Sequence, residues 1–332
     1  MTNSMSSRER MLTTLTRKGE TDRVPYVELC VDNGVAQRIA GVDRWLTDLE
    51  FSTLLELDNI NYWGAMPPLF VDRAAATNGR EYHVGGLIKT KDDLAKMVFP
   101  DPHSDAFYEP AVQFAKAKGD LAACAVMYMG IDPTILSMGL QGFSYALYDD
   151  IELVHEILNK YASWASIVVE RLCEIGFDII WAADDIAGSS APFFSPEVYR
   201  NVLLPHVKKV AKKITVPWLY HSDGNLLPVM DDLLSLGMNA LHPIEPKAMD
   251  IFELKREYGS RVCLVGNIDL NTLTLGTPDD VRREVIEKIR RLAPGGGYLL
   301  SSSSSIASYC KPENVAAMVK AVKEFGRYPI IG

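Results

Sequence analysis

The stretch Ile214-Thr-Val-Pro-Trp-Leu-Tyr-His-Ser-Asp-Gly224 decides the fold. Its apolar, β-branched and aromatic beginning predicts a buried strand, and His221 and Asp223 stand where that strand ends. Folds of the α/β class place their chemistry at this end of parallel strands. We therefore expect His221 and Asp223 to share one face of an active site.

Four further segments repeat this order of an apolar strand and a polar ending. They are residues 179–185, 240–245, 263–269 and 298–302. Helical patterns separate them, which predicts parallel strands joined by right-handed crossovers. Counted back to a first strand at 24–29, the units number about eight, which is the number that closes a (β/α)₈ TIM barrel.

The runner-up architecture is an open doubly wound sheet. Such a sheet carries a glycine-rich phosphate loop after an early strand, and neither G-x-G-x-x-G nor G-x-x-x-x-G-K-[ST] occurs. The glycines at 295–297 precede their strand, so they predict a helix-to-strand turn.

We expect one barrel domain over residues 1–332, with an N-terminal helix within 1–22 and an insertion at 76–100 that contains a hairpin. Residues 32–75 are expected to form short helices and a loop.

Composition limits the partners. The chain of 332 residues is 48% hydrophobic and has a net charge of −9, without basic patches. This argues against a nucleic-acid or anionic-membrane partner. No apolar stretch approaches the roughly 20 residues of a membrane span, and the N-terminus has no apolar signal core. We expect a cytoplasmic protein.

The five cysteines are widely spaced and form no C-x-x-C pair. Neither a disulfide framework nor a zinc finger is therefore indicated. Cys30, Cys124, Cys173 and Cys263 lie in apolar runs and are expected in the core. Cys310 differs, because it lies in a loop that enters a helix.

Several motifs together resemble the uroporphyrinogen decarboxylase superfamily. They are Arg8-Glu-Arg10, Asp22-Arg-Val-Pro25, His221-Ser-Asp-Gly-Asn225, Leu241-His-Pro-Ile-Glu245, Val265-Gly-Asn-Ile-Asp269, Pro294-Gly-Gly-Gly-Tyr298 and Pro312-Glu-Asn-Val315. The resemblance covers almost the whole chain and implies the barrel independently. It leaves the reaction open, because the superfamily includes porphyrinogen decarboxylases and cobalamin-dependent methyltransferases.

The decarboxylase branch carries an arginine-rich motif after its first strand that binds the carboxylates of a tetrapyrrole. The corresponding stretch here begins with Glu28 and Asp32 and has no arginine before Arg38. Carboxylates in that pocket repel such a substrate. The resemblance therefore does not extend to uroporphyrinogen decarboxylation itself.

The methyltransferase branch commonly binds zinc through His-x-Cys and a later cysteine. Here His221 and Asp223 occupy the positions of the His-x-Cys pair, and Ser304 occupies the position at which the later cysteine of the family would fall. His221 and Asp223 are therefore expected as two ligands of a metal site. Barrel closure brings all strand ends to one rim, so Cys310 in the loop after the last strand is expected as the third ligand, with Glu245 on the neighbouring strand as the alternative. A harder His/carboxylate site suits oxygen-bound methyl donors. A metal-free site with His221 as general acid stays open.

Further candidates lie at the other strand ends. Asp184 or Asp185 is expected as the donor acid, because adjacent carboxylates raise one another's pKa, and the other of the two can instead cap the next helix. The residues expected to bind substrate are Glu28, Met127, His242, Glu245, Asn267 and Tyr309. A core role is the alternative for Met127 and His242. The serines at 301–305 either hold a polar ligand or satisfy one another.

The function expected first is methyl transfer from a small donor to the cobalt of a separate corrinoid protein, with a methoxylated aromatic as the expected donor class. The chain has no Asp-x-His-x-x-Gly motif, so cobalamin must arrive on a partner. The alternatives are a metal-independent decarboxylase or lyase that uses Asp184 or Asp185 as proton donor, and a non-catalytic corrinoid-binding protein. A homodimer is left open.

Overall fold

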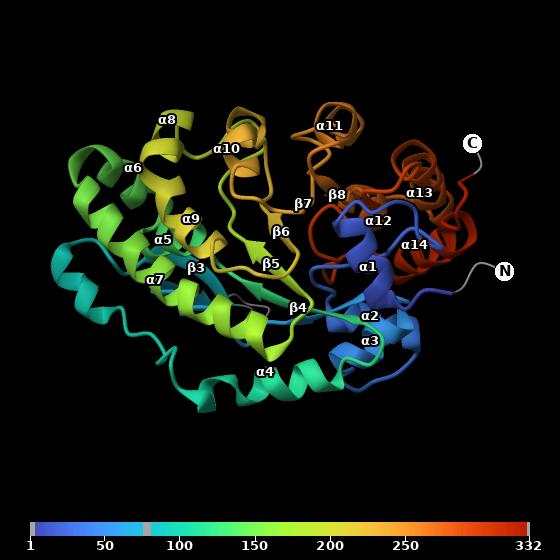
Figure 1. The fold of residues 1–332 in the computed structure, drawn as a ribbon, viewed down its shortest axis with the longest axis horizontal. Helices are drawn as coiled ribbons and strands as arrows, with labels where there is room; N and C mark the ends of the chain where they lie inside the picture. Colours follow the sequence, from blue (N-terminus) through green and yellow to red (C-terminus); the bar gives the residue numbers. More distant parts are fainter. Residues whose placement is uncertain (1–3, 76–80, 331–332) are drawn as a thin grey trace.

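The computed structural model describes residues 4–75 and 81–330. Its centre is a parallel sheet in the order β1-β4-β5-β6-β7-β8-β9, with the helices around it (Figure 1). The strands are β1 (Asn59–Tyr62), β4 (Ala122–Met127), β5 (Ile179–Ala183), β6 (Trp218–His221), β7 (Ala240–His242), β8 (Cys263–Val265) and β9 (Tyr298–Leu299). Each strand lies beside the next one along the chain, which is the order of a barrel and not of a doubly wound sheet.

An extended segment at residues 24–31 joins the two edges of this sheet. The Val27 amide donates to the Leu300 carbonyl at 3.0 Å, and the Asp58 amide donates to the Tyr26 carbonyl at 2.8 Å. The segment forms only isolated bridges instead of the strand expected at 24–29. Side chains replace part of the ladder, because the amides of Asn59 and Asn61 donate to the Glu28 carbonyl.

Strand β1 corrects the expectation of only short helices and a loop over residues 32–75. Asparagine is depleted in strands, and half of this strand is asparagine, so its sequence reads as a turn. The physical reason for the strand is the closure just described. Asn59 and Asn61 donate to backbone carbonyls of the neighbouring extended segment.

Helices follow the strands as expected. They are α1 (Ser7–Leu15), α2 (Asn33–Ala40), α3 (Asp48–Leu54), α4 (Asp105–Ala117), α5 (Ile131–Met138), α6 (Leu140–Asp149), α7 (Ile151–Ile175), α8 (Pro196–Val198), α9 (Leu204–Ala211), α10 (Met230–Leu234), α11 (Ile251–Tyr258), α12 (Leu270–Leu275), α13 (Pro278–Leu292) and α14 (Pro312–Phe325). Short 3₁₀ turns lie at Lys91–Lys96 and Leu227–Val229, and a π-helical turn lies at Tyr199–Leu203. Local signals set several of these ends; for example, Thr277 and Asp280 form the capping box of α13.

A separate antiparallel pair, β2 (Val71–Ala75) and β3 (Glu81–Gly86), forms the expected hairpin. It begins before the predicted insertion at 76–100. Residues 76–80 of that prediction lie outside the described residues. The glycines at 295–297 all have positive φ and join α13 to β9, which confirms the predicted turn.

The barrel interior is filled by one apolar cluster. Alternate side chains of the strands, such as Cys124, Trp181 and Leu219, point into it. Met11 and Leu15 of α1 belong to the same cluster and are fully buried. Helix α1 lies against β1, β4 and β9, and the cluster that it joins contains the first residues of β4, β5, β7 and β8, so α1 closes the N-terminal end of the barrel.

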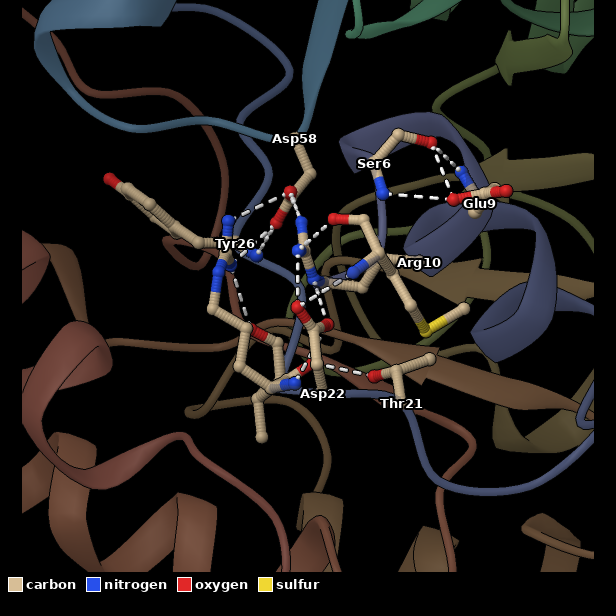
Figure 2. Close-up of polar contacts among 10 residues, drawn as sticks. Ser6, Glu9, Arg10, Thr21, Asp22, Tyr26 and Asp58 are labelled. Atoms are coloured by element: carbon tan, nitrogen blue, oxygen red, sulfur yellow. Dashed lines mark hydrogen bonds and ion pairs between the residues drawn. The ribbon is translucent and has the colours of Figure 1, made fainter. Parts of the chain in front are cut away.

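A buried ion-pair network fastens α1 to this end, as Figure 2 shows. The Arg10 guanidinium donates to Asp22 at 2.7 Å and to Asp58 at 2.5 Å. Asp58 is fully buried and also accepts from Arg23 and from the Tyr26 amide. The network links the helix, the extended segment and β1.

Replacing Arg10 by methionine is expected to lower the free energy of unfolding by about 3 kcal/mol, because the buried Asp58 and Asp22 carboxylates lose a shared cation. Arg23 limits the loss, since it still pairs with Asp58. The matched control is Arg8→Met on the same helix. The Arg8 side chain is 51% exposed and its partner Asp178 keeps Lys118. Equilibrium denaturation should show a loss under about 1 kcal/mol there; equal losses would contradict the assignment.

The cysteine expectation was wrong in part. Cys124 and Cys263 are buried, but Cys30 is exposed and Cys173 is partly buried, whereas Cys310 is buried. Cys30 lies near the end of the extended segment at residues 24–31, where the apolar run meets solvent. Among the described residues, no helix combines the length and apolarity that crossing a bilayer requires.

Candidate functional site

The site lies where β5 and β6 end side by side. Ala183 and His221 are register partners on these strands. Because side chains alternate along a strand, Trp181 and Ala183 in the interior cluster make Asp185 the next residue on that face. The same alternation from Leu219 brings His221 and Asp223 to the interior face of β6. Two neighbouring strands thus deliver three polar side chains to one place.

These three residues form a compact group. One ligand atom from each of Asp185, His221 and Asp223 lies within 4.8 Å of the others. His221 Nε2 lies 3.5 Å from Asp185 Oδ1, which also accepts from the Asp223 amide at 2.8 Å. Asp223 Oδ2 accepts from the Ser304 hydroxyl at 3.3 Å. Within the described residues, Asp223 Oδ1 is buried and has no hydrogen-bond partner.

Gly224 makes this arrangement possible. It has a φ of +87°, and a Cβ there would lie 2.5 Å from the Ala187 carbonyl oxygen. Its amide donates to Glu245 Oε2 at 3.0 Å. A side chain at this position would therefore push the loop after β6 away from its neighbours. The glycine of the motif thus has a structural reason of its own, beside the two predicted site residues His221 and Asp223.

The local electrostatics favour a cation. Burial raises the pKa of Asp223 to about 6, the His221 imidazole lowers it, and the Asp185 and Glu245 carboxylates raise it further. Carboxylates that crowd one another in this way are stabilised by a positive ion placed between them.

A row of hydrogen bonds leads from His221 across the barrel. His221 Nδ1 lies 2.7 Å from His242 Nδ1, and His242 Nε2 lies 3.3 Å from the Ser301 hydroxyl. The Ser301 hydroxyl lies 3.4 Å from Glu28 Oε2. The amide of Ser302 donates to Glu28 Oε1 at 3.0 Å, and its hydroxyl to Oε2 at 2.5 Å.

Burial dominates the ionisation of this row. It raises the pKa of Glu28 to about 8 although the Ser302 and Ser301 hydroxyls lower it. It also holds the pKa of His242 well below its ordinary value. Of the predicted substrate-binding residues, Glu28 and His242 are therefore joined to His221 and buried behind it.

A cavity of about 560 Å³ opens beside the group. Residues that line it include Asp223, Glu245, Lys247, Asp269, Ser304 and Tyr309. Glu245 and Tyr309 were both predicted to bind substrate, and both face this space. The Tyr309 side chain is 59% exposed at its edge.

The structure does not bring Asp184 to the group. Its carboxylate is fully buried and accepts from the amides of Met129 at 3.2 Å, Gly130 at 3.4 Å and Ile131 at 3.2 Å, at the start of α5. It therefore holds the N-terminus of α5, a helix that precedes β5 in the chain, and not that of the next helix, where the capping alternative had placed it. Asp185 alone of the pair faces the interior.

Sequence reasoning missed Asp132, which lies beside this pair. It is buried at the start of α5 and accepts from the backbone amide of Asp185. Burial raises its pKa well above its ordinary value, and the carboxylates of Asp185 and Asp184 add to the shift. An acid before Pro133, just after a strand, was the available signal.

Three other predicted residues lie away from the group. Met127 packs in the cluster between the sheet and the helices, because its position on β4 alternates with that of the inward Val126. Asn267 is buried and its amide donates to the Ile244 carbonyl at 2.6 Å. Cys310 is buried with its sulfur 3.9 Å from the Thr274 hydroxyl.

A metal fits the observed donors in a different combination from the expected one. Cys310 joins no group of potential ligands in the described part of the chain, and Asp185 stands in its place. The unpartnered, buried Oδ1 of Asp223 is the kind of atom that a bound cation would satisfy. Nitrogen and oxygen donors of this set suit zinc or a harder divalent ion.

Comparison with known proteins adds a family and a fold. The family model described as uroporphyrinogen decarboxylase (URO-D) matches residues 88–325. A protein named uroporphyrinogen decarboxylase from Chlorobium phaeobacteroides is 25% identical over 260 residues, covering 71% of this chain and 70% of the relative. One of the same name from Methylococcus capsulatus is 26% identical over 255 residues, covering 72% and 70%. Among solved structures, a methyltransferase from Methanosarcina mazei matches with a TM-score of 0.76 and 21% identity, over 97% of this chain and 99% of that one.

Proposed function

The chain belongs to the uroporphyrinogen decarboxylase family, and from this premise we propose that it is a methyltransferase that moves a methyl group from a small donor to a separate corrinoid protein. A methoxylated aromatic is the donor class that we favour. The observation that carries the proposal is the group Asp185, His221 and Asp223 at the end of the strands, with its unpartnered buried oxygen beside a cavity.

The proposed reaction breaks the methyl–oxygen bond of the donor. The electron pair of that bond stays on oxygen, and the methyl carbon passes to the reduced corrinoid of the partner, which acts as the second substrate. The difficult part is the poor leaving group, because negative charge develops on an alkoxide or phenoxide oxygen. A Lewis-acidic cation held by the three residues would stabilise that charge.

The residues of the chain divide the remaining work. His221 and Asp223 would hold the cation from β6, and Asp185 would hold it from β5. Glu245 orients the turn through Gly224 and lines the cavity with Tyr309. The cavity lies beside the strand ends at the open side of the barrel, so the donor would enter there before the corrinoid partner docks over the mouth.

A second candidate is a metal-independent decarboxylase acting on a small carboxylated substrate. The curated relatives are named uroporphyrinogen decarboxylase, which supports decarboxylation as the alternative reaction. Lys247 lines the cavity and offers a cation for a substrate carboxylate, and Asp223, whose pKa burial raises to about 6, offers a proton donor. A porphyrinogen substrate is not supported, because residues 28–34 contain no arginine and contribute the carboxylates of Glu28 and Asp32 instead.

The test incubates the purified protein with a panel of methoxyarenes and a corrinoid carrier protein reduced to cobalt(I), and follows methylcobalt absorbance. We expect methyl transfer with at least one donor, its loss after chelation, and its return on adding zinc. Transfer to no carrier from any donor would overturn the proposal. Release of carbon dioxide from small carboxylic acids, unaffected by chelation, would instead support the decarboxylase.

A further inference from the structure

Four buried polar side chains form a continuous row that the methyl transfer itself does not require. His221, His242, Ser301 and Glu28 are 6%, 0%, 0% and 1% exposed, and each lies within 3.4 Å of the next. They come from β6, from β7, from the loop after β9 and from the extended segment at residues 24–31 that joins the edges of the sheet. The row begins at the proposed cation site and ends at a carboxyl on the far side of the barrel.

With both imidazoles neutral and every bond of the row made, these groups allow two orderings of the hydrogens. If Glu28 is ionised, Ser301 donates to it, His242 Nε2 donates to Ser301, and His221 Nδ1 donates to His242 Nδ1. His221 Nε2 then carries a lone pair toward Asp185 and Asp223. If Glu28 is protonated and donates to Ser301, every bond reverses, and His221 Nε2 carries a hydrogen.

We propose that this row couples the cation site to Glu28, so that binding a divalent cation at His221 ionises Glu28 on the opposite side of the barrel. The inference rests on the proposed cation site. As the cation binds, the Nε2 hydrogen of His221 leaves to solvent. One hydrogen then moves at each step, from Glu28 to Ser301, from Ser301 to His242, and from His242 to His221 Nδ1. Both histidines stay neutral, and only Glu28 changes charge.

The environment of Glu28 makes this change observable near neutral pH. Burial raises its pKa to about 8, so the carboxyl is mostly protonated at pH 7 in the cation-free protein. The titratable groups that interact electrostatically with Glu28 are Tyr26, Cys30 and Cys310. Burial raises the pKa of each of them, so all three are neutral at pH 7. The new carboxylate balances part of the positive charge that enters the barrel.

The experiment measures protons released on cobalt(II) binding to the full chain, by calorimetry at pH 7 in buffers of different ionisation enthalpy. Wild type is expected to release about 0.9 proton from the row, from a pKa near 8. Glu28→Gln is expected to release no proton from the row. Its amide can donate to Ser301 or accept from it, so the hydrogens can reverse their order without any proton leaving the row. Hydrolysis of cobalt-bound water is common to both proteins and cancels in the difference.

Two further variants separate the row from general damage. Ser301→Ala breaks the row and should suppress the release as Glu28→Gln does, with weaker cobalt binding. Ser303→Ala lies two residues away, and its hydroxyl oxygen accepts from the Leu270 amide instead; its release should equal that of wild type. At pH 9 wild type and Glu28→Gln should agree, because Glu28 is then already ionised.

Infrared difference spectra give an independent readout. Cobalt(II) should remove the carbonyl stretch of one more protonated carboxyl in wild type and in Ser303→Ala than in Glu28→Gln. Changes at Asp132 and Asp223, whose pKa values burial also raises, are common to the three proteins and cancel in the difference. Equal proton release in wild type and Glu28→Gln, with cobalt bound by both, would overturn the coupling alone. Failure of wild type to bind cobalt(II) would overturn the cation site and the coupling together.

Discussion

Replacing His221 by alanine is expected to lower methyl transfer by about 10³-fold and to abolish stoichiometric metal binding. His221 lies at the centre of the group, and its two ring nitrogens face Asp185 and His242. Alanine leaves the two carboxylates without the neutral ligand between them. Metal content by mass spectrometry and methylcobalt formation are the measurements.

The matched control for this variant is His155→Gln. His155 lies on α7 and pairs with His206 of α9 at 3.0 Å, outside the barrel. It should keep both metal and activity. Activity at the wild-type level in His221→Ala would remove the basis of the proposed function, including its metal-free form in which His221 is a general acid.

The second large effect is expected at Asp184 and Asp185, which follow β5. Substituting one should lower stability, and substituting the other should weaken metal binding. Asp185→Asn is expected to weaken metal binding by at least about 100-fold with little loss of stability. The side chain is 45% exposed, and an amide oxygen can still accept from the Asp223 amide. Titration with cobalt(II) and denaturation of the same samples provide both numbers.

Asp184→Asn is expected to lower the free energy of unfolding by about 3 kcal/mol while metal affinity in the folded protein is retained. The substituted amide group would meet the backbone donors of Met129, Gly130 and Ile131 with a donor of its own. If Asp184→Asn lost metal and Asp185→Asn did not, the assignment of the two acids would be reversed.

Alternation along the strands could have separated these two acids from the sequence. Trp181 and Ala183 occupy the same face as Asp185, and Asp184 falls on the other face. The same rule places Met127 outside, since it lies next to the inward Val126. The strand-end pattern predicted the barrel, His221 and Asp223, but it treated every residue near a strand end as equal.

Other features needed the third dimension. The contact of His221 with His242 depends on the register of β6 and β7, and the contact of Ser301 with Glu28 depends on closure between the end of the chain and its beginning. Cys310 was predicted as a ligand because barrel closure brings the strand ends to one rim, yet its sulfur lies 3.9 Å from the Thr274 hydroxyl of α12. Loop direction is not encoded in residue type or spacing.

The helix that closes the N-terminal end of the barrel also restricts how molecules reach the polar group. Met11 and Leu15 fill the cluster at the N-terminal end of the barrel. In the described part of the chain, the polar group is therefore approached from the opposite end, where the strands finish beside the cavity. Under the proposed function, donor and carrier protein share that approach. The small molecule must therefore load before the carrier docks, and its demethylated product must leave after the carrier departs. Initial-rate kinetics would consequently follow a compulsory order, imposed by the architecture and independent of how fast the bond breaks.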